Sequence, residues 1–286
     1  MYDAAPPATR WPQDARICMS VTVGFEAFLL AGHMSFGRAK PGEKNAFSLS
    51  FADYAHKVGV WRILDVLERH KVKATFDVGG LAAERHPKVV RAIAEAGHEV
   101  AGHGWANDVL PQEDDLEGEL KGIKDTLAAI EAACGERPRG WVSPGSMSTS
   151  MTRKRLVDEG LRWDGDDISQ DLPFVARQGD KSIVVLPRVN LPCNDLITCV
   201  IFGNPPGAYL EGFVETFDFL YREGLRGRPG WVDIIIHADL GARPYLMSVI
   251  EKAIAYAKGH DGVWFARRED IAAWTLSQHD ALVVRI

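Results

Sequence analysis

Two patterns of hydrophobic and polar positions alternate along the chain. Short apolar runs rich in β-branched residues, such as the run at 234–236 that ends in His237, predict buried strands. Longer stretches with an apolar residue at every third or fourth position predict helices that pack one face on a core. The patterns predict strands at 16–25, 72–78, 98–101, 140–142, 161–163, 182–186, near 197, 231–237 and 262–264, and helices at 54–70, 87–96, 113–133, 149–159, 208–222, 244–258 and 267–274.

This alternation predicts an α/β fold in which helices surround a parallel sheet. The number of strand–helix units favours a closed or nearly closed (β/α) barrel over an open sheet. No internal repeat or linker is visible in the sequence. We therefore expect a single domain over residues 1–286, with residues 1–15 as an extended N-terminal arm.

Composition and charge narrow the class of protein. The 286 residues are 46% hydrophobic and 25% charged, which suits one large globular domain and excludes a disordered or fibrous chain. The net charge of −6, with no block of Lys or Arg, predicts neither a nucleic-acid nor a membrane partner. No run approaches the roughly 18 apolar residues of a membrane span, and the first residues lack the features of a secretion signal. We expect a soluble, cytoplasmic protein that acts on a small molecule.

The carboxyl ends of barrel strands and the loops after them usually carry the chemistry. This rule selects Glu26, His103 with its neighbour Trp105, Ser143 and His237. Glu26 could be a solvated loop residue, His103 a turn residue, and His237 a buried histidine satisfied by a backbone carbonyl. A catalytic interpretation is favoured because apolar runs flank Glu26, glycines flank His103, and His237 ends a buried strand.

Several stretches resemble the NodB-type polysaccharide deacetylases, and together they span nearly the whole chain. They are ATFDV at 74–78, GHEV at 97–100 with GHGW at 102–105, RPRGW at 137–141, and further matches at 163–167, 172–174 and 262–271. The resemblance implies a distorted (β/α) barrel of the NodB type.

The resemblance also shows where this chain departs from the metal-dependent deacetylases. Those enzymes use an aspartate base and an aspartate ligand after the first strand, and two histidines four residues apart. The matching positions here are Gly24, Glu26, His103 and Asn107, and Val142 replaces an arginine that the family often carries. A helical turn would place His103 and residue 107 on one face, but an Asn amide is a poor zinc ligand. We therefore expect no cofactor; if zinc or another divalent metal is bound, Glu26 and His103 are the expected ligands.

At the positions where it departs, the chain resembles the allantoinases and cyclic imide hydrolases of this superfamily. Some of these enzymes open small rings without a bound metal. Residues 11–16, 59–62 and 241–244 add to this resemblance. It implies a hydrolase of a small cyclic amide, imide or ureide and a homo-oligomer. Glu26, His103 and His237 become the catalytic residues. Glu26 is the expected base, acting on a water between itself and His103, and His237 is the expected acid or oxyanion donor.

Further polar and aromatic residues are candidates for contact with the substrate: Trp105, Asn107, Ser143, Asp195 and Arg243. Asn107 is equally well explained as a helix cap, Asp195 as a turn residue, and Trp105 is more simply a packing residue. Asp195 is also a candidate for orienting a histidine. His33, in a loop with glycine, is expected to border the pocket on a mobile flap.

Two other functions remain open. A metal-dependent deacetylase of an N-acetylated sugar or peptidoglycan fragment would fit the wider family, although Asn107 disfavours it. A catalytically inactive binding protein with the same fold would be consistent with Gly24 at the position of the family's base.

Overall fold

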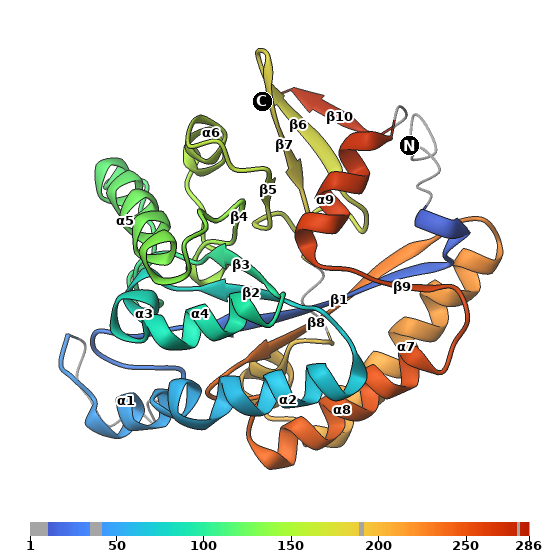
Figure 1. Ribbon diagram of the computed structural model, residues 1–286, viewed down its shortest axis with the longest axis horizontal. Coiled ribbons are helices and arrows are strands. Elements are labelled where there is room, and N and C mark those ends of the chain that lie inside the picture. The colour runs from blue at the N-terminus through green and yellow to red at the C-terminus, as the bar shows by residue number, and fades with distance from the viewer. Residues whose placement is uncertain (1–10, 35–41, 189–191, 279–280, 286) are drawn as a thin grey trace.

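A mostly parallel sheet forms the centre of the computed structural model, which describes residues 11–34, 42–188, 192–278 and 281–285 (Figure 1). Its strands follow the order β10-β6-β7-β5-β4-β3-β2-β1-β8, and β9 also pairs with β1. Only β6 and β7 pair in antiparallel fashion among the described strands. The strands are β1 (Ile17–Phe25), β2 (Thr75–Val78), β3 (Glu99–Gly102), β4 (Gly140–Trp141), β5 (Trp163–Asp164), β6 (Phe174–Gln178), β7 (Lys181–Val185), β8 (Gly230–His237), β9 (Val263–Phe265) and β10 (Val283–Arg285).

Helices pack on the outside of this sheet and cover its apolar residues (Figure 1). Proline begins α4, α7 and α8, where its missing N–H costs no helical hydrogen bond. The helices are α1 (Ala46–Ala52), α2 (Val60–His70), α3 (Gly80–Arg85), α4 (Pro87–Glu95), α5 (Leu116–Cys134), α6 (Thr152–Asp158), α7 (Pro206–Leu225), α8 (Pro244–Lys258) and α9 (Arg268–Ser277), with the short helical turns η1 (Pro12–Asp14), η2 (Ala55–Gly59), η3 (Pro144–Ser146) and η4 (Leu196–Ile201).

The α/β fold of the NodB barrel type that the sequence predicts is confirmed, with differences in detail. The strand expected near 197 is wrong: this segment is the helical turn η4, because Asp195 and Asn194 accept hydrogen bonds from the N–H groups of Leu196 and Ile197. The sequence patterns missed α1, α3, β6 and β10, which are short. The barrel is distorted, since the strand order has two ends, β10 and β8, within the described residues.

The N-terminal arm is described only from Trp11 onward. Trp11 is buried, and its Nε1 donates a hydrogen bond to the Gly230 carbonyl at 2.8 Å. Residues 11–15 therefore pack on the start of β8, and residues 1–10 lie outside the described residues. Each helix in the described segments is too short or too polar to cross a bilayer.

The register of the sheet brings three strand ends to one edge. Gly24 of β1 pairs with His237 of β8, Phe25 pairs with Val78 of β2, and Val78 pairs with Gly102 of β3. Glu26 and His103 directly follow β1 and β3, so they emerge beside His237 at the carboxyl edge. The chain then turns: Gly104 has a φ of 63°, and a Cβ there would lie 2.3 Å from Pro144. The helical turn considered from the sequence for 103–107 is thus wrong, since these residues form a loop.

Candidate active site

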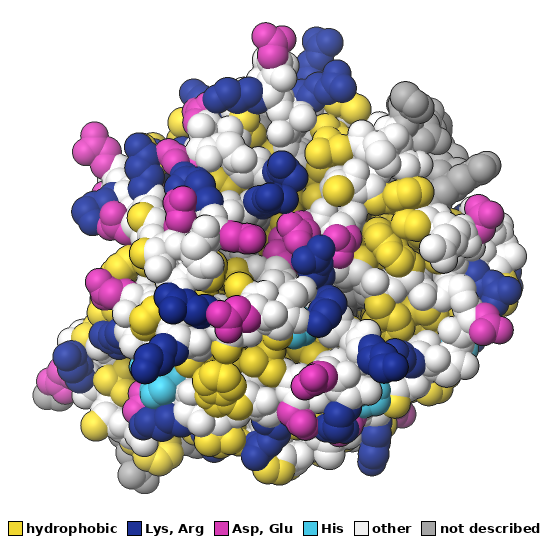
Figure 2. Space-filling model, viewed as in Figure 1, with side chains coloured by type: hydrophobic (Ala, Val, Ile, Leu, Met, Phe, Trp, Pro, Cys, Tyr) yellow, Lys and Arg dark blue, Asp and Glu magenta, His cyan; other side chains and the backbone are white. Residues whose placement is uncertain are grey.

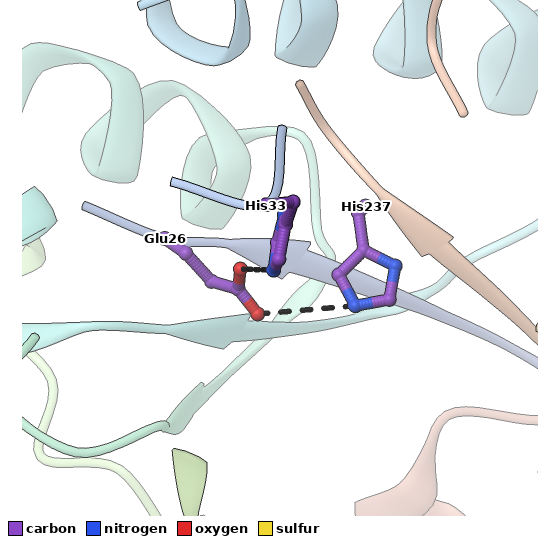
Figure 3. A group of neighbouring side chains, drawn as sticks. All are labelled: Glu26, His33 and His237. Atoms are coloured by element: carbon purple, nitrogen blue, oxygen red, sulfur yellow. Dashed lines mark ion pairs between the residues drawn. The ribbon is translucent and has the colours of Figure 1, made fainter. Parts of the chain in front are cut away.

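Glu26 lies at the centre of a buried cluster of polar side chains. Its Oε1 is 3.0 Å from His103 Nε2, and its Oε2 is 3.0 Å from His33 Nε2 and from Asn107 Nδ2. His237 Nε2 lies 4.0 Å from Oε1. Figure 3 shows His33 and His237 pointing toward the Glu26 carboxylate. The direct contact of Glu26 with His103 leaves no space for the water that the sequence interpretation placed between them.

The rings of His103 and His237 are held by their Nδ1 atoms. His103 Nδ1 lies 2.8 Å from the carbonyl oxygen of Val142, which can only accept, so this nitrogen carries a proton. His237 Nδ1 lies 2.6 Å from Asp195 Oδ1, and the other oxygen of Asp195 accepts from the His237 backbone N–H. Both Nε2 atoms are thereby directed toward Glu26.

His33 joins the cluster from the loop after β1. Its Nδ1 lies 3.3 Å from both oxygens of Asp239, and its ring stands edge-on to His237 with centroids 4.9 Å apart. The side chain is only 9% exposed, so His33 belongs to the cluster itself, whereas the sequence suggested only a bordering position. Its one sequence signal was a polar residue in an apolar loop after β1, because no regular spacing relates 33 to 26 or 237.

Burial and charge determine the protonation of the cluster. Burial by itself raises the pKa of Glu26, but the charge of His33 and the hydrogen bond from His103 outweigh it and hold the pKa well below 4.5. Burial likewise lowers the pKa of His33, yet Glu26 and Asp239 raise it well above 6.5. The pKa of His103 is also raised, because Glu26 outweighs burial. The arrangement favours an ionised carboxylate between two protonated imidazoles.

The structure also brings Asn107 and Asp195 into contact with the cluster. Asn107 Nδ2 bonds Glu26, while its Oδ1 is buried without a partner in the described residues. Asp195 is fully buried and holds His237. Of the roles considered for Asp195, the structure shows the contact with a histidine and the turn contact with the Leu196 N–H.

Ser143, Trp105 and Arg243 lie outside the cluster. Ser143 is buried and bonds Asp166 through both its N–H and its hydroxyl, at 2.7 Å each. Trp105 is half-buried and, with Ser143, lines a separate pocket of about 210 Å³. The Arg243 guanidinium lies 3.8 Å from the centroid of the Phe51 ring, and its Nε donates to the Asp239 carbonyl. These contacts give Arg243 a role in holding the loop that carries Asp239.

Gly24 sets the space beside the cluster. A Cβ at this position would lie 3.0 Å from Glu26 Oε1 and 3.5 Å from His237 Cδ2. Any larger side chain at 24 would therefore require Glu26 to move.

One subset of the cluster has the chemistry of a metal site. Glu26, His33 and His237 each offer a ligand atom, and these atoms lie within 4.8 Å of one another (Figure 3). One carboxylate and two imidazoles suit a divalent transition metal, and aspartates behind both histidines are common around such sites. These three residues fit a metal ion. The group contains His33, whereas the sequence suggested His103 as the histidine ligand.

Comparisons with known proteins agree with this fold. A family model described as polysaccharide deacetylase matches residues 39–163. A putative polysaccharide deacetylase of Schizosaccharomyces pombe is 32% identical over 305 residues, covering 93% of this chain and 92% of the relative. A peptidoglycan deacetylase of Helicobacter pylori is 25% identical, covering 88% of this chain and 94% of the relative.

Solved structures give the same result. A probable polysaccharide deacetylase from Pseudomonas aeruginosa superposes with a TM-score of 0.88 at 31% identity, covering 98% of this chain and 97% of that one. The Puue allantoinase superposes with a TM-score of 0.87, also at 31% identity, covering 98% of this chain and 96% of that one.

Fold and cluster together define a NodB-type barrel with a carboxylate–histidine centre at the carboxyl edge of its strands. The chain belongs to the polysaccharide deacetylase family.

Proposed function

We propose that this protein hydrolyses a small cyclic amide, imide or ureide by attack of water on a ring carbonyl, without a required metal. The observation that carries this proposal is the packing at Gly24. The family resemblance places the aspartate base of the metal-dependent deacetylases at this position, but its Cβ would lie 3.0 Å from Glu26 Oε1. An aspartate at this position would require the Glu26 carboxylate to shift. The Puue allantoinase is as similar to this chain as the Pseudomonas polysaccharide deacetylase is, and this similarity supports ring hydrolysis.

His237 is the best placed general base. Asp195 accepts from its Nδ1 and from its backbone N–H, which leaves the Nε2 lone pair directed into the cluster. A buried carboxylate behind a histidine fixes the tautomer and stabilises the imidazolium that forms when the histidine takes a proton. Glu26 is a weaker base than the sequence interpretation assumed, because its pKa is held well below 4.5.

The other cluster residues supply electrostatic stabilisation. When water adds to the ring carbonyl, its proton passes to His237 and negative charge develops on the carbonyl oxygen. The protonated His33 and His103 favour this charge, and Glu26 keeps both imidazoles charged. His237 then returns the proton to the ring nitrogen as the C–N bond breaks.

A second candidate, a metal-dependent deacetylase of an N-acetylated sugar, is favoured by the group of Glu26, His33 and His237. These three residues would hold a divalent ion, which when bound would polarise the substrate carbonyl and lower the pKa of a water. His237 would then be a ligand and could not act as the base. The printed names of the fission-yeast and Helicobacter relatives also support this candidate.

One assay separates the two. Ring opening of imides, hydantoins and allantoin, and deacetylation of N-acetylglucosamine oligomers, are measured with protein stripped by a chelator and with zinc-restored protein. We expect ring opening that survives stripping. Activity only on the sugars and only after zinc returns would replace the first proposal by the second. No activity on either class of substrate, with stripped or with zinc-restored protein, would indicate a binding protein that has lost catalysis.

A further inference from the structure

Buried polar atoms without hydrogen-bond partners are concentrated inside the barrel. Among the described residues, Asp77 Oδ1, Arg188 Nε and two nitrogens of Arg268 lack a partner. These side chains face one another, with Asp77 Oδ2 3.9 Å from Arg188 Nη1 and 3.8 Å from Arg268 Nη1. Both separations exceed a hydrogen bond. Because unpaired buried donors are costly, this arrangement is incomplete without a further polar group.

The two arginines differ in what they reach. Arg268 is fully buried, and it donates to Asp233 Oδ2 at 2.6 Å and to Thr75 through its backbone N–H, so it braces the barrel interior. Arg188 follows β7 at the carboxyl edge, and its side chain is 10% exposed. Its Nη2 donates to the hydroxyl of Ser146, in the loop after β4. Arg188 is therefore the member of this group that a ligand entering from the carboxyl edge can meet.

Asp77 connects Arg188 with the catalytic cluster. In the β1–β2 pairing Asp77 lies opposite Gly24, the residue beside Glu26 and His237. Asp77 also interacts electrostatically with both His103 and Arg188. Arg188 thus reaches from the end of β7 to within 3.9 Å of Asp77, and the strand pairing places Asp77 beside Gly24 of the cluster.

We propose that Arg188 binds a second carbonyl oxygen of the substrate ring and so selects imides and ureides over lactams and acetamido sugars. This inference rests on the proposed function. One carbonyl of such a ring is attacked at the cluster, and the other stays bonded to the leaving nitrogen. Guanidinium donors suit this second oxygen as an acceptor.

The second carbonyl also gives Arg188 an effect on the reaction rate. As the bond between the attacked carbon and the nitrogen breaks, negative charge on the nitrogen spreads onto the second carbonyl oxygen. A guanidinium donating to that oxygen stabilises the leaving group, and His237 supplies the proton that completes the amide product. A lactam or an N-acetyl group has no such oxygen and gains nothing from Arg188.

The test compares Arg188→Met and Arg188→Lys with the full-length wild type, using succinimide as substrate and 2-pyrrolidinone, a ring of the same size with one carbonyl, as competitive inhibitor. We expect kcat/KM for succinimide to fall by about 10- to 100-fold in Arg188→Met, the range for a lost charged hydrogen bond. The inhibition constant of 2-pyrrolidinone should stay unchanged. Arg188→Lys should recover part of the loss, because it keeps the charge without the planar donors.

Arg155→Met is the matched control, since this arginine has a similarly low exposure of 12% and pairs with Glu119 outside the cluster. It should retain wild-type kcat/KM, with folding of all variants compared by circular dichroism. If the wild type opens succinimide but both Arg188 variants match it, the inference is wrong and the proposed function stands. If the wild type opens no ring, the proposed function and the inference about Arg188 are both wrong. Should Arg188→Met fail to fold, the comparison of Arg188→Lys with the wild type decides.

Discussion

At the scale of single residues, one buried carboxylate and its neighbours define the chemistry. Glu26 contacts His33 and His103 directly, and His237 approaches from the neighbouring strand β8. The approach depends on Gly24, which contributes no side chain. Because the two contacting histidines compensate the charge of Glu26, we propose that His237, the histidine bonded to Asp195, transfers the proton.

Asp195→Asn tests this assignment. The amide cannot hold the His237 tautomer or stabilise its protonated form, so kcat should fall by about 10²- to 10⁴-fold while KM changes little. The measurement is steady-state kinetics on the ring substrate identified by the panel. Asp218→Asn is the matched control, because Asp218 accepts one hydrogen bond from Tyr256 away from the cluster. Equal kcat in Asp195→Asn and wild type would rule out His237 as the base.

At the scale of elements, the loop after β1 delivers His33. The carboxylate of Asp108 accepts hydrogen bonds from the backbone N–H groups of Leu29 and Leu30, at 2.9 and 2.7 Å, and from Ala31 at 3.3 Å. Asp108 directly follows Asn107, which bonds Glu26. The loop after β3 therefore fixes the loop after β1, and two segments far apart in sequence position one cluster.

Asp108→Ala should loosen the loop that carries His33. We expect kcat/KM to fall by about 10- to 100-fold, since small displacements of catalytic groups are costly, while the melting temperature changes little. Hydrogen exchange at the amides of 29–31 should become faster. Glu113→Ala removes a similar carboxylate, which accepts hydrogen bonds from Ser150 in another loop. It should leave kcat/KM and the hydrogen exchange at 29–31 unchanged. Unaltered exchange at 29–31 in Asp108→Ala would show that the loop keeps its conformation without Asp108.

At the scale of the whole molecule, the two ends of the barrel carry different sets of side chains. The carboxyl edge holds the cluster, and the opposite end is a charged hollow between α4 and α9 (Figure 2). Glu99, Arg139, Arg267 and Glu269 are among the residues that line a pocket of about 380 Å³ there. The predicted homo-oligomer stays a prediction.

Glu99 makes stability depend on pH. Burial raises its pKa from 4.5 to about 7, despite the hydrogen bond from Thr75. The folded protein therefore holds a proton that the unfolded chain releases, so this stabilisation is complete below pH 4.5 and is lost as the pH rises through about 7. The loss amounts to at most about 3 kcal/mol. Urea unfolding at several pH values should show it for wild type and not for Glu99→Gln. Parallel pH curves for the two proteins would contradict the assignment.

Most of the fold could be predicted from the sequence, because hydrophobic periodicity is local and survives without knowledge of contacts. Strand and helix positions followed from it, and short elements such as α3 and β6 escaped because they hold too few residues to show a period. Glu26, His103 and His237 could also be selected, since parallel strands present their carboxyl ends at one edge.

The sequence by itself therefore determined the layers of the fold and three residues of the cluster. Only the tertiary structure decided the roles. His33 meets Asp239 across 206 positions and Asp195 meets His237 across 42, and no spacing rule relates such pairs. Which histidine compensates Glu26, which one is free to take a proton, and which arginine faces the carboxyl edge depend on distances of a few ångströms that arise only when the barrel is assembled.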